Sequence, residues 1–134
     1  MKILIDSNIP MYFAGREHPN RPPSERFFAA VERKEVDACT SAEVLQEILY
    51  RYSALHRLDL ARQVYDLFVI VCPVVLDVTL ADTNRARDLL MGRPGISARD
   101  ALHAAVMLNH GVEWIATFDA GVDRVAGIRR FRLE

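Results

Sequence analysis

The sequence predicts a three-layer α/β/α sandwich around a central parallel sheet of four to five strands. Short apolar segments alternate along the chain with longer segments whose apolar residues recur at helical spacing. Within the short segments the apolar residues are continuous, which is typical of strands buried on both faces of a parallel sheet. The 134 residues suffice for one domain with a substantial core, so we expect a single domain over residues 1–134.

The first half of the chain is expected to contain a strand, two helices, a second strand and two further helices, at residues 2–5, 8–13, 24–34, 36–40, 41–55 and 58–68. Asn8 can cap the first helix and Ser24 the second, because their side-chain oxygens accept hydrogen bonds from unpaired N–H groups. Between these helices, residues 14–23 form a loop rich in proline, glycine and arginine. Thr40 or Ser41 caps the next helix.

The second half is expected to contain an edge strand, two helices and two strands, at residues 69–76, 79–91, 97–109, 113–117 and 128–133. Pro73 interrupts the first of these segments, which is typical of a short strand or an edge strand. Thr79 and Ser97 begin the two helices, and Gly111 ends the second one.

Composition argues against a strongly basic nucleic-acid binder, a secreted protein and a membrane-spanning protein. The formal net charge is −1, so any binding of nucleic acid must come from a local patch. The two cysteines, Cys39 and Cys72, lie in apolar surroundings and are interpreted as reduced core residues of a cytoplasmic protein. The apolar run after Lys2 is too short for a signal peptide, and no segment approaches the roughly 20 apolar residues of a membrane span.

Two acids follow predicted strands. Asp6 comes directly after the first strand, and Asp119 comes one residue beyond the strand that ends at Thr117. Because the carboxyl ends of parallel strands share one edge of a sheet, both side chains should stand at the edge where ligands of such sheets bind. Each could also be an ordinary residue of a turn.

Two helical acids are candidates to join them. Glu47 lies at the border of the apolar stripe of its helix, and its ordinary alternative is an ion pair with Arg51 one turn later. Asp100 lies three residues after Ser97, where it also fits a capping box. Glu43 fits a capping box with the preceding threonine and needs no other role. The evidence for a site therefore rests on all four acids together.

Four segments in this order resemble the PIN-domain family, and most closely the VapC-type ribonuclease toxins of prokaryotic toxin–antitoxin pairs: ILIDSN at 3–8, SAEVLQE at 41–47, RDALHAA at 99–105 and ATFDAGVD at 116–123. The resemblance spans essentially the whole chain. It implies that a divalent metal is held by an acidic quartet formed by Asp6, Glu47, Asp100 and Asp119. It further implies a peripheral acid and three polar supports, which are Asp123, Ser7, Asn8 and Thr117. Ser7 keeps the hydroxyl of the usual threonine, and Val122 replaces a common aromatic residue.

By this resemblance the chain is a metal-dependent endoribonuclease that uses one or two Mg²⁺ or Mn²⁺ ions. Such ions lower the pKa of bound water and stabilise charge at the scissile phosphate, and they take oxygen ligands. The resemblance also implies a homodimer and a cognate antitoxin whose tail occupies the active groove. The amphipathic helices at 41–55 and 58–68 are candidate surfaces for these partners. RNA is the expected substrate, because exposed single-stranded bases can bend into a metal cleft.

The arginines expected near the active edge are Arg16, Arg21, Arg93 and Arg99, although each could also be a solvated surface charge. His103 lies one turn after Asp100 among apolar neighbours, and we interpret it as a partly buried structural histidine.

Other functions remain open. A PIN-like nuclease of RNA processing or DNA repair would need no antitoxin, and a PIN-like module could have lost catalysis and only bind a partner. A HAD-type phosphatase needs a second aspartate where this chain has Asn8. A phosphatase of that type and a response-regulator receiver both need a late lysine, whereas the lysines here are Lys2 and Lys34.

Overall fold

The computed structural model describes all 134 residues and confirms the three-layer α/β/α sandwich. Helices and strands follow one another as β1 (Lys2–Ile5), α1 (Asn8–Ala14), α2 (Arg21–Glu32), β2 (Asp37–Ser41), α3 (Ala42–Ala54), α4 (Leu58–Val71), β3 (Val75–Leu76), α5 (Leu80–Gly92), α6 (Ala98–Asn109), β4 (Trp114–Ala116), a 3₁₀ turn η1 (Gly121–Arg124) and β5 (Arg129–Phe131). None of these helices combines the length and the apolar character needed to cross a membrane.

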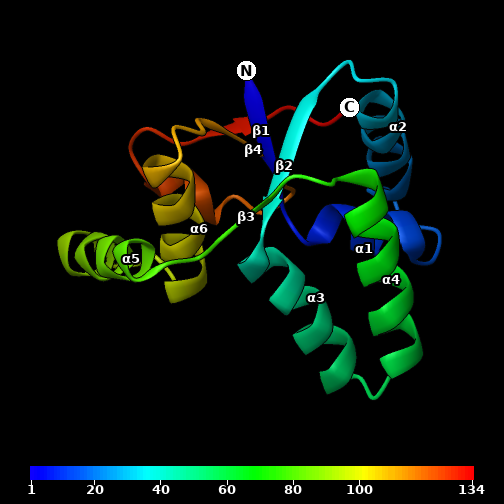
Figure 1. Cartoon of the computed structure of the whole chain (residues 1–134), viewed down its shortest axis with the longest axis horizontal. Helices are drawn as coiled ribbons and strands as arrows, with labels where there is room; N and C mark the ends of the chain where they lie inside the picture. Colours follow the sequence, from blue (N-terminus) through cyan, green and yellow to red (C-terminus); the bar gives the residue numbers. More distant parts are fainter.

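The five strands form one parallel sheet in the order β3-β2-β1-β4-β5. β1 lies at its centre, where Leu4 is paired with Cys39 of β2 on one side and with Ile115 of β4 on the other. In Figure 1 helices α5 and α6 cover one face of the sheet, while α1, α2 and α4 lie on the other. Because all strands run the same way, the residues that follow β1, β2 and β4 meet at one edge.

The core is a single cluster of buried apolar side chains between the sheet and both helical layers. Phe28 of α2 and Phe68 of α4 are fully buried and stack at 6.2 Å between ring centroids. Cys39 and Cys72 are buried free thiols, and burial raises their pKa values to about 11 and about 12. Both cysteines therefore stay protonated and unreactive near neutral pH, as expected for core residues.

Helix α2 begins at Arg21, three residues earlier than expected, so the predicted loop at 14–23 is shorter. Pro22 and Pro23 fit in its first turn, where backbone N–H groups have no helical partner to lose. Ser24 consequently lies inside the helix and does not cap it, and its hydroxyl donates to the carbonyl of Asn20 at 2.7 Å.

Helix α4 continues to Val71, so the strand expected at residues 69–76 is reduced to β3. Phe68 and Val71 are both buried at helical spacing, which favours continuing the helix over starting a strand. The remaining Val75–Leu76 pair forms the short edge of the sheet.

Ser41 caps α3, because its hydroxyl accepts a hydrogen bond from the backbone N–H of Val44 at 3.2 Å. The capping box expected between Thr40 and Glu43 is wrong, because the Thr40 hydroxyl donates instead to the carbonyl of Ile5 at 3.0 Å. That bond ties the end of β2 to the end of β1, where Asp6 follows.

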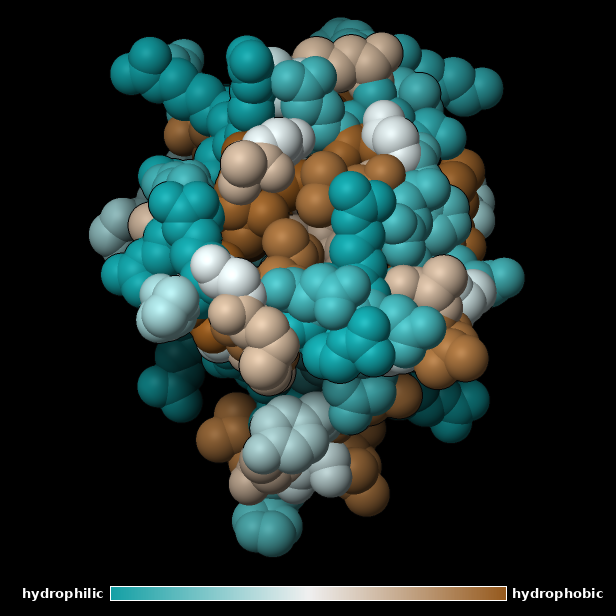
Figure 2. Space-filling model, turned by 90° about the vertical axis from the view of Figure 1, so that its left-hand side faces the viewer, coloured by the Kyte–Doolittle hydropathy of each residue, from teal (hydrophilic) through white to brown (hydrophobic).

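Helices α3 and α4 form a hairpin that projects downward in Figure 1, past the strand ends. Its tip is apolar and exposed: Tyr50, Leu55 and Leu58 each leave about two thirds of their surface in solvent. Figure 2 shows several hydrophobic side chains gathered on this lower lobe. An exposed apolar tip of this kind is a candidate surface for a partner.

Candidate metal centre

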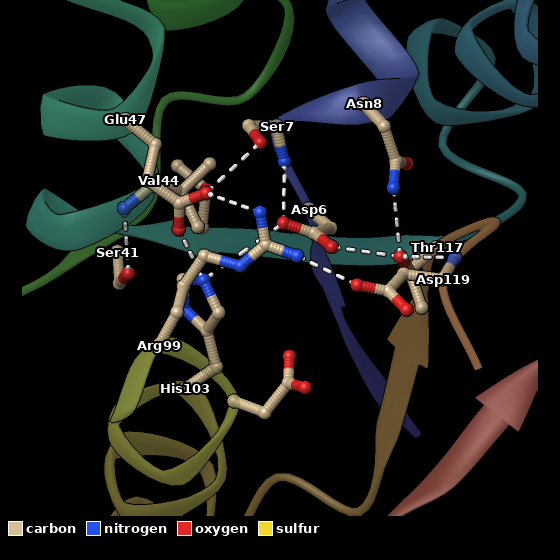
Figure 3. A network of polar contacts seen from close by, with 12 residues as sticks. Asp6, Ser7, Asn8, Ser41, Val44, Glu47, Arg99, His103, Thr117 and Asp119 are labelled. Carbon is tan, nitrogen blue, oxygen red and sulfur yellow. Dashed lines mark hydrogen bonds and ion pairs between the residues drawn. The ribbon is translucent and has the colours of Figure 1, made fainter. Parts of the chain in front are cut away.

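Asp6 is fixed at the carboxyl edge of the sheet by two hydrogen bonds (Figure 3). The backbone N–H of Ser7 donates to its Oδ1 at 2.7 Å, and the hydroxyl of Thr117 donates to its Oδ2 at 2.7 Å. The Thr117 oxygen in turn accepts from the side-chain amide of Asn8 at 2.9 Å and from the backbone N–H of Asp119 at 3.1 Å. The Asp6 carboxylate is thereby held in one orientation while it is almost fully buried.

Asn8 does not cap α1, contrary to the prediction. Ser7 occupies the cap position without a side-chain cap, and Asn8 is the first helical residue. Its amide reaches across to the loop after β4, where the oxygen accepts from the backbone N–H of Phe118 at 3.4 Å and the nitrogen donates to Thr117. This cross-strand link is favoured because β1 and β4 are neighbours in the sheet.

Glu47 projects from α3 toward Asp6 and is 6% exposed. The centre is the region between Asp6, Glu47, Asp100 and Asp119. The hydroxyl of Ser7 donates to its Oε2 at 3.3 Å, and His103 Nε2 contacts its Oε1. Because a carboxylate only accepts hydrogen bonds, the ring nitrogen must donate. Glu47 is therefore an inward-facing residue of the centre, and it pairs with α6 instead of with Arg51 on its own helix.

His103 was missed as a site residue by sequence reasoning. It is 1% exposed, and its Nε2 lies 3.9 Å from Asp6 Oδ1 as well as against Glu47. Its Nδ1 is buried without a hydrogen-bond partner, so the hydrogen bonding of the ring runs through Nε2. Asp6, Glu47 and His103 offer ligand atoms within 4.8 Å of one another, a group that could hold a metal ion.

Arg99 of α6 lies across the centre in Figure 3. Its Nη2 donates to Asp119 Oδ2 at 2.6 Å, and its Nη1 lies 3.6 Å from Glu47 Oε2. Burial lowers the pKa of Arg99, but the charges of Glu47, Asp6, Asp100 and Asp119 outweigh burial and raise it. All four predicted acids therefore act on this one guanidinium.

Asp100 lies in the first turn of α6, which Ser97 caps by accepting from the Asp100 N–H at 3.1 Å. The Asp100 carboxylate packs against the backbone of Gly121, where any Cβ would collide with its Oδ2. The Gly121 N–H donates to Asp119 Oδ1 at 2.9 Å. A side chain at position 121 would force the Asp100 carboxylate to shift, an effect that the sequence pattern gave no reason to expect.

The remaining predicted residues lie away from this group. Asp123 forms a bidentate ion pair with Arg130 at 2.7 and 2.9 Å on the surface. Arg16 and Arg93 are exposed, and Arg21 pairs with a glutamate one turn later on α2. Of the four predicted arginines, only Arg99 contacts the acids of the centre.

Glu47 and His103 shift each other's pKa. Burial raises the pKa of Glu47, but the hydrogen bond and charge of His103, with Arg99 and Ser7, lower it overall. Burial lowers the pKa of His103, but its hydrogen bond to Glu47 and the charges of Asp6 and Glu47 raise it overall. The pair therefore favours an imidazolium beside a carboxylate.

Comparison with known proteins points to one family. A model described as PIN domain matches residues 3–128. Ribonuclease VapC13 of Mycobacterium tuberculosis is 41% identical over 128 residues, which cover 96% of this chain and 98% of that protein. Among solved structures, the M. tuberculosis VapC20 toxin, described as sarcin–ricin loop cleaving, superposes with a TM-score of 0.73 at 19% identity, covering 95% of this chain and 98% of that one. A toxin–antitoxin complex from Klebsiella pneumoniae gives 0.64 at 17% identity and covers 95% of each chain.

The Glu47–His103 pair predicts how stability without metal depends on pH. The folded pKa of His103 lies above its ordinary 6.5, so its contribution is complete below about pH 6.5 and is lost as pH rises through the raised pKa. The folded pKa of Glu47 lies below its ordinary 4.5, so its contribution is present above about pH 4.5 and is lost as pH falls through the lowered pKa.

His103→Gln should therefore cost more unfolding free energy at about pH 5.5 than at about pH 9, measured by urea denaturation in EDTA. His56→Asn is the matched control, because His56 is exposed and asparagine tolerates its φ of 56°. An equal cost of His103→Gln at both pH values would contradict the pairing.

Proposed function

The chain belongs to the PIN-domain family, and from this membership we propose that it is a divalent-metal-dependent endoribonuclease and the toxin of a toxin–antitoxin pair. One observation supports the proposal most strongly: Arg99 pairs with Glu47 and Asp119 at the carboxyl edge of the sheet, and the charges of Asp6 and Asp100 also raise its pKa. A relative at 41% identity is a ribonuclease. RNA and an antitoxin would both be met in the cytoplasm, where we place the activity.

The donor set fits one or two Mg²⁺ or Mn²⁺ ions. Carboxylates separated by about 4 Å repel by roughly 4 kcal/mol per pair at an effective dielectric near 20. Arg99 and a protonated His103 together neutralise only two of the four charges. Mg²⁺ and Mn²⁺ both prefer such oxygen ligands. Asp6 and Glu47 would be direct ligands, with Asp100 and Asp119 completing the set. A bound ion would supply a water of lowered pKa and stabilise the charge of the phosphate.

The residues around the acids orient them. Ser7 and Thr117 each donate to Asp6, and Asn8 holds Thr117 in place. His103 donates to Glu47 and thereby fixes the carboxylate from the side of α6. We assign these residues a positioning role, because partners of this kind commonly change metal affinity or activity by about 10- to 100-fold. Asp123, on the surface, would act only at the periphery.

Arg99 would bind the scissile phosphate. Its guanidinium already lies between acids from α3 and from the loop after β4, and its planar fork matches phosphate oxygens. Neutralisation of those acids by an ion would free Arg99 for the substrate. Arg16, Arg21 and Arg93 would contact the RNA backbone farther from the scissile bond.

A groove next to the centre suits the antitoxin. It has a volume of about 410 Å³, and its lining joins the apolar hairpin tip to the centre through Met11, Glu47, Tyr50, Arg51, Ala54, Leu55 and Arg99. An antitoxin segment with apolar residues could fill the groove and cover the acids at once. The exposed tip of the α3–α4 hairpin also suits the contact of a homodimer.

Asp6→Asn should reduce RNA cleavage to the level seen with EDTA, because the change keeps the shape of the side chain and removes its charge. The measurement is cleavage of a single-stranded RNA in Mg²⁺ or Mn²⁺. Asp66→Asn, an exposed acid of α4, is the control and should keep full activity. Full activity of Asp6→Asn would refute the mechanism, and no cleavage by the unaltered protein would favour a silent module.

Saturating Mn²⁺ or Mg²⁺ should raise the melting temperature, since the ion binds only the folded acids. At about 100 times the dissociation constant the gain is about 2.7 kcal/mol, which corresponds to a rise of roughly 5–20 °C. Differential scanning fluorimetry measures it, and Asp6→Asn should remove most of the rise. A melting temperature that neither ion changes would contradict a metal site.

Leu55→Asp should weaken binding of the antitoxin at least about tenfold, since it places a charge in the apolar groove. Light scattering at micromolar concentration measures both the homodimer and the complex with the protein encoded by the neighbouring gene. Ile70→Asp is the control, because Ile70 is also apolar and exposed but lines a different pocket. Equal antitoxin binding by both variants would exclude this groove as the docking site.

A further inference from the structure

Three aromatic rings cluster beside the centre, and the chemistry proposed above does not use them. Tyr12 projects from α1, His18 lies in the loop before α2, and Phe118 lies between Thr117 and Asp119. The Tyr12 and His18 rings stack at 4.6 Å between centroids with 29° between their planes. Phe118 meets Tyr12 edge to face at 5.3 Å and 86°. His18 is therefore the outer ring of an aromatic platform, which comprises these three side chains.

His18 is held in one orientation although it is exposed. The backbone N–H of Asn20 donates to its Nδ1 at 3.0 Å, so the ring carries its proton on Nε2. The N–H of Arg21 donates to the His18 carbonyl at 3.0 Å. An exposed side chain normally loses rotamer entropy when a ligand orders it. Because His18 is already ordered by these bonds and by Tyr12, a ligand that stacks on it avoids much of that cost.

The platform is joined to the centre by hydrogen bonds. Asn8 accepts from the backbone N–H of Phe118 at 3.4 Å and donates to Thr117, whose hydroxyl donates to Asp6. Tyr12 lies one helical turn after Asn8 on the same helix. Tyr12 and Phe118 are thus carried by segments whose residues Asn8 and Thr117 hold Asp6 in place, and His18 is joined to them by stacking on Tyr12. A group bound on the platform therefore lies at a fixed place relative to the acids.

Packing alone does not account for the platform. Rings that only stabilise a fold gain their energy by burial, whereas His18 is exposed and Tyr12 and Phe118 are only partly buried. Beside His18 lies an open pocket of about 510 Å³ lined by Glu17, His18, Pro19, Arg21, Pro22 and Glu25. Glu17 and Glu25 outnumber Arg21 in this lining, so the pocket itself carries no net positive charge to attract a phosphate. The interaction that this surface can make with a ligand is stacking of a flat group on the His18 ring.

We propose that His18, supported by Tyr12 and Phe118, stacks an unpaired nucleobase of the RNA strand close to the bond that is cut. Single-stranded RNA is bound in this way by aromatic side chains, and every base has a face that can stack. This inference rests on the proposed ribonuclease function and adds a site that binds a base beside the site that cuts the backbone.

The test measures binding of a fluorescein-labelled oligoadenylate by fluorescence anisotropy in Mg²⁺, with all variants in the non-cleaving Asp6→Asn background. His18→Ala should raise the dissociation constant about 5- to 150-fold, the range that corresponds to one stacked base. His18→Phe keeps a flat ring and should bind within about threefold of the parent. His56→Asn, at an exposed histidine elsewhere whose φ of 56° asparagine tolerates, should not change binding.

The dependence on salt separates stacking from contacts with phosphate. His18→Ala should leave the slope of log affinity against log salt unchanged, because stacking releases no counterions. Arg16→Ala, which removes a cation in the same loop, should reduce the slope by about 0.7. An altered slope for His18→Ala, or failure of His18→Phe to restore binding, would overturn the platform.

The outcomes also separate this inference from the proposed function. If the unaltered protein cuts RNA but His18→Ala binds oligoadenylate as tightly as its parent, the platform is refuted and the ribonuclease stands. If His18→Ala weakens binding of the antitoxin and not of RNA, the surface belongs to a protein partner and the inference is overturned. If the unaltered protein neither cuts nor binds RNA, both proposals fail. Because His18 is exposed, its variants should keep the melting temperature of the parent.

Discussion

Mutual repulsion among carboxylates is the constraint on which the arrangement of this molecule depends. Asp6, Glu47, Asp100 and Asp119 come from four separate parts of the chain, and the charges of all four raise the pKa of Arg99. Their mutual repulsion disfavours folding. Within the protein, the positive charges of Arg99 and of the His103 imidazole partly offset that repulsion. The cost is tolerable because the mounts are rigid. Asp6 directly follows the central strand, whose three last residues are buried, so that the core holds what electrostatics would separate.

The hydroxyl of Thr117 links the acids to the helix that follows β1. The Thr117 side chain donates once and accepts twice, which uses the full capacity of a hydroxyl. Its three partners are Asp6, the amide of Asn8 and the N–H of Asp119, so it joins the ends of β1 and β4 to the start of α1. Tyr12 is carried by the same helix. The proposed metal ligand Asp6 and the Tyr12 ring of the proposed base-binding platform are therefore both held in place through Thr117 and helix α1.

Sequence reasoning placed Asp6 and Asp119 correctly because strand direction alone decides where the carboxyl ends of parallel strands lie. Glu47 was ambiguous, because a position at the border of an apolar stripe does not reveal which neighbour it faces across the helix. His103 was missed for a related reason. Its partner Glu47 is 56 residues away, and a histidine among apolar residues has the same local pattern whether it faces a core or a carboxylate. The start of α2 was misplaced since two prolines suit a first turn as well as a loop.

A protein with a net charge of −1 has little long-range attraction for RNA, and its acidic centre would repel a phosphate that approached without an ion. Arg99 cannot compensate while its guanidinium is engaged by Asp119 and Glu47. Stacking on His18 needs no charge and is not opposed by the acids. Stacking of a base on His18 would therefore keep the RNA beside the centre even though the acids repel its phosphates. A strand held in this way would stay near the acids, and Arg99 would be free to bind the phosphate once the charges of Glu47 and Asp119 are neutralised.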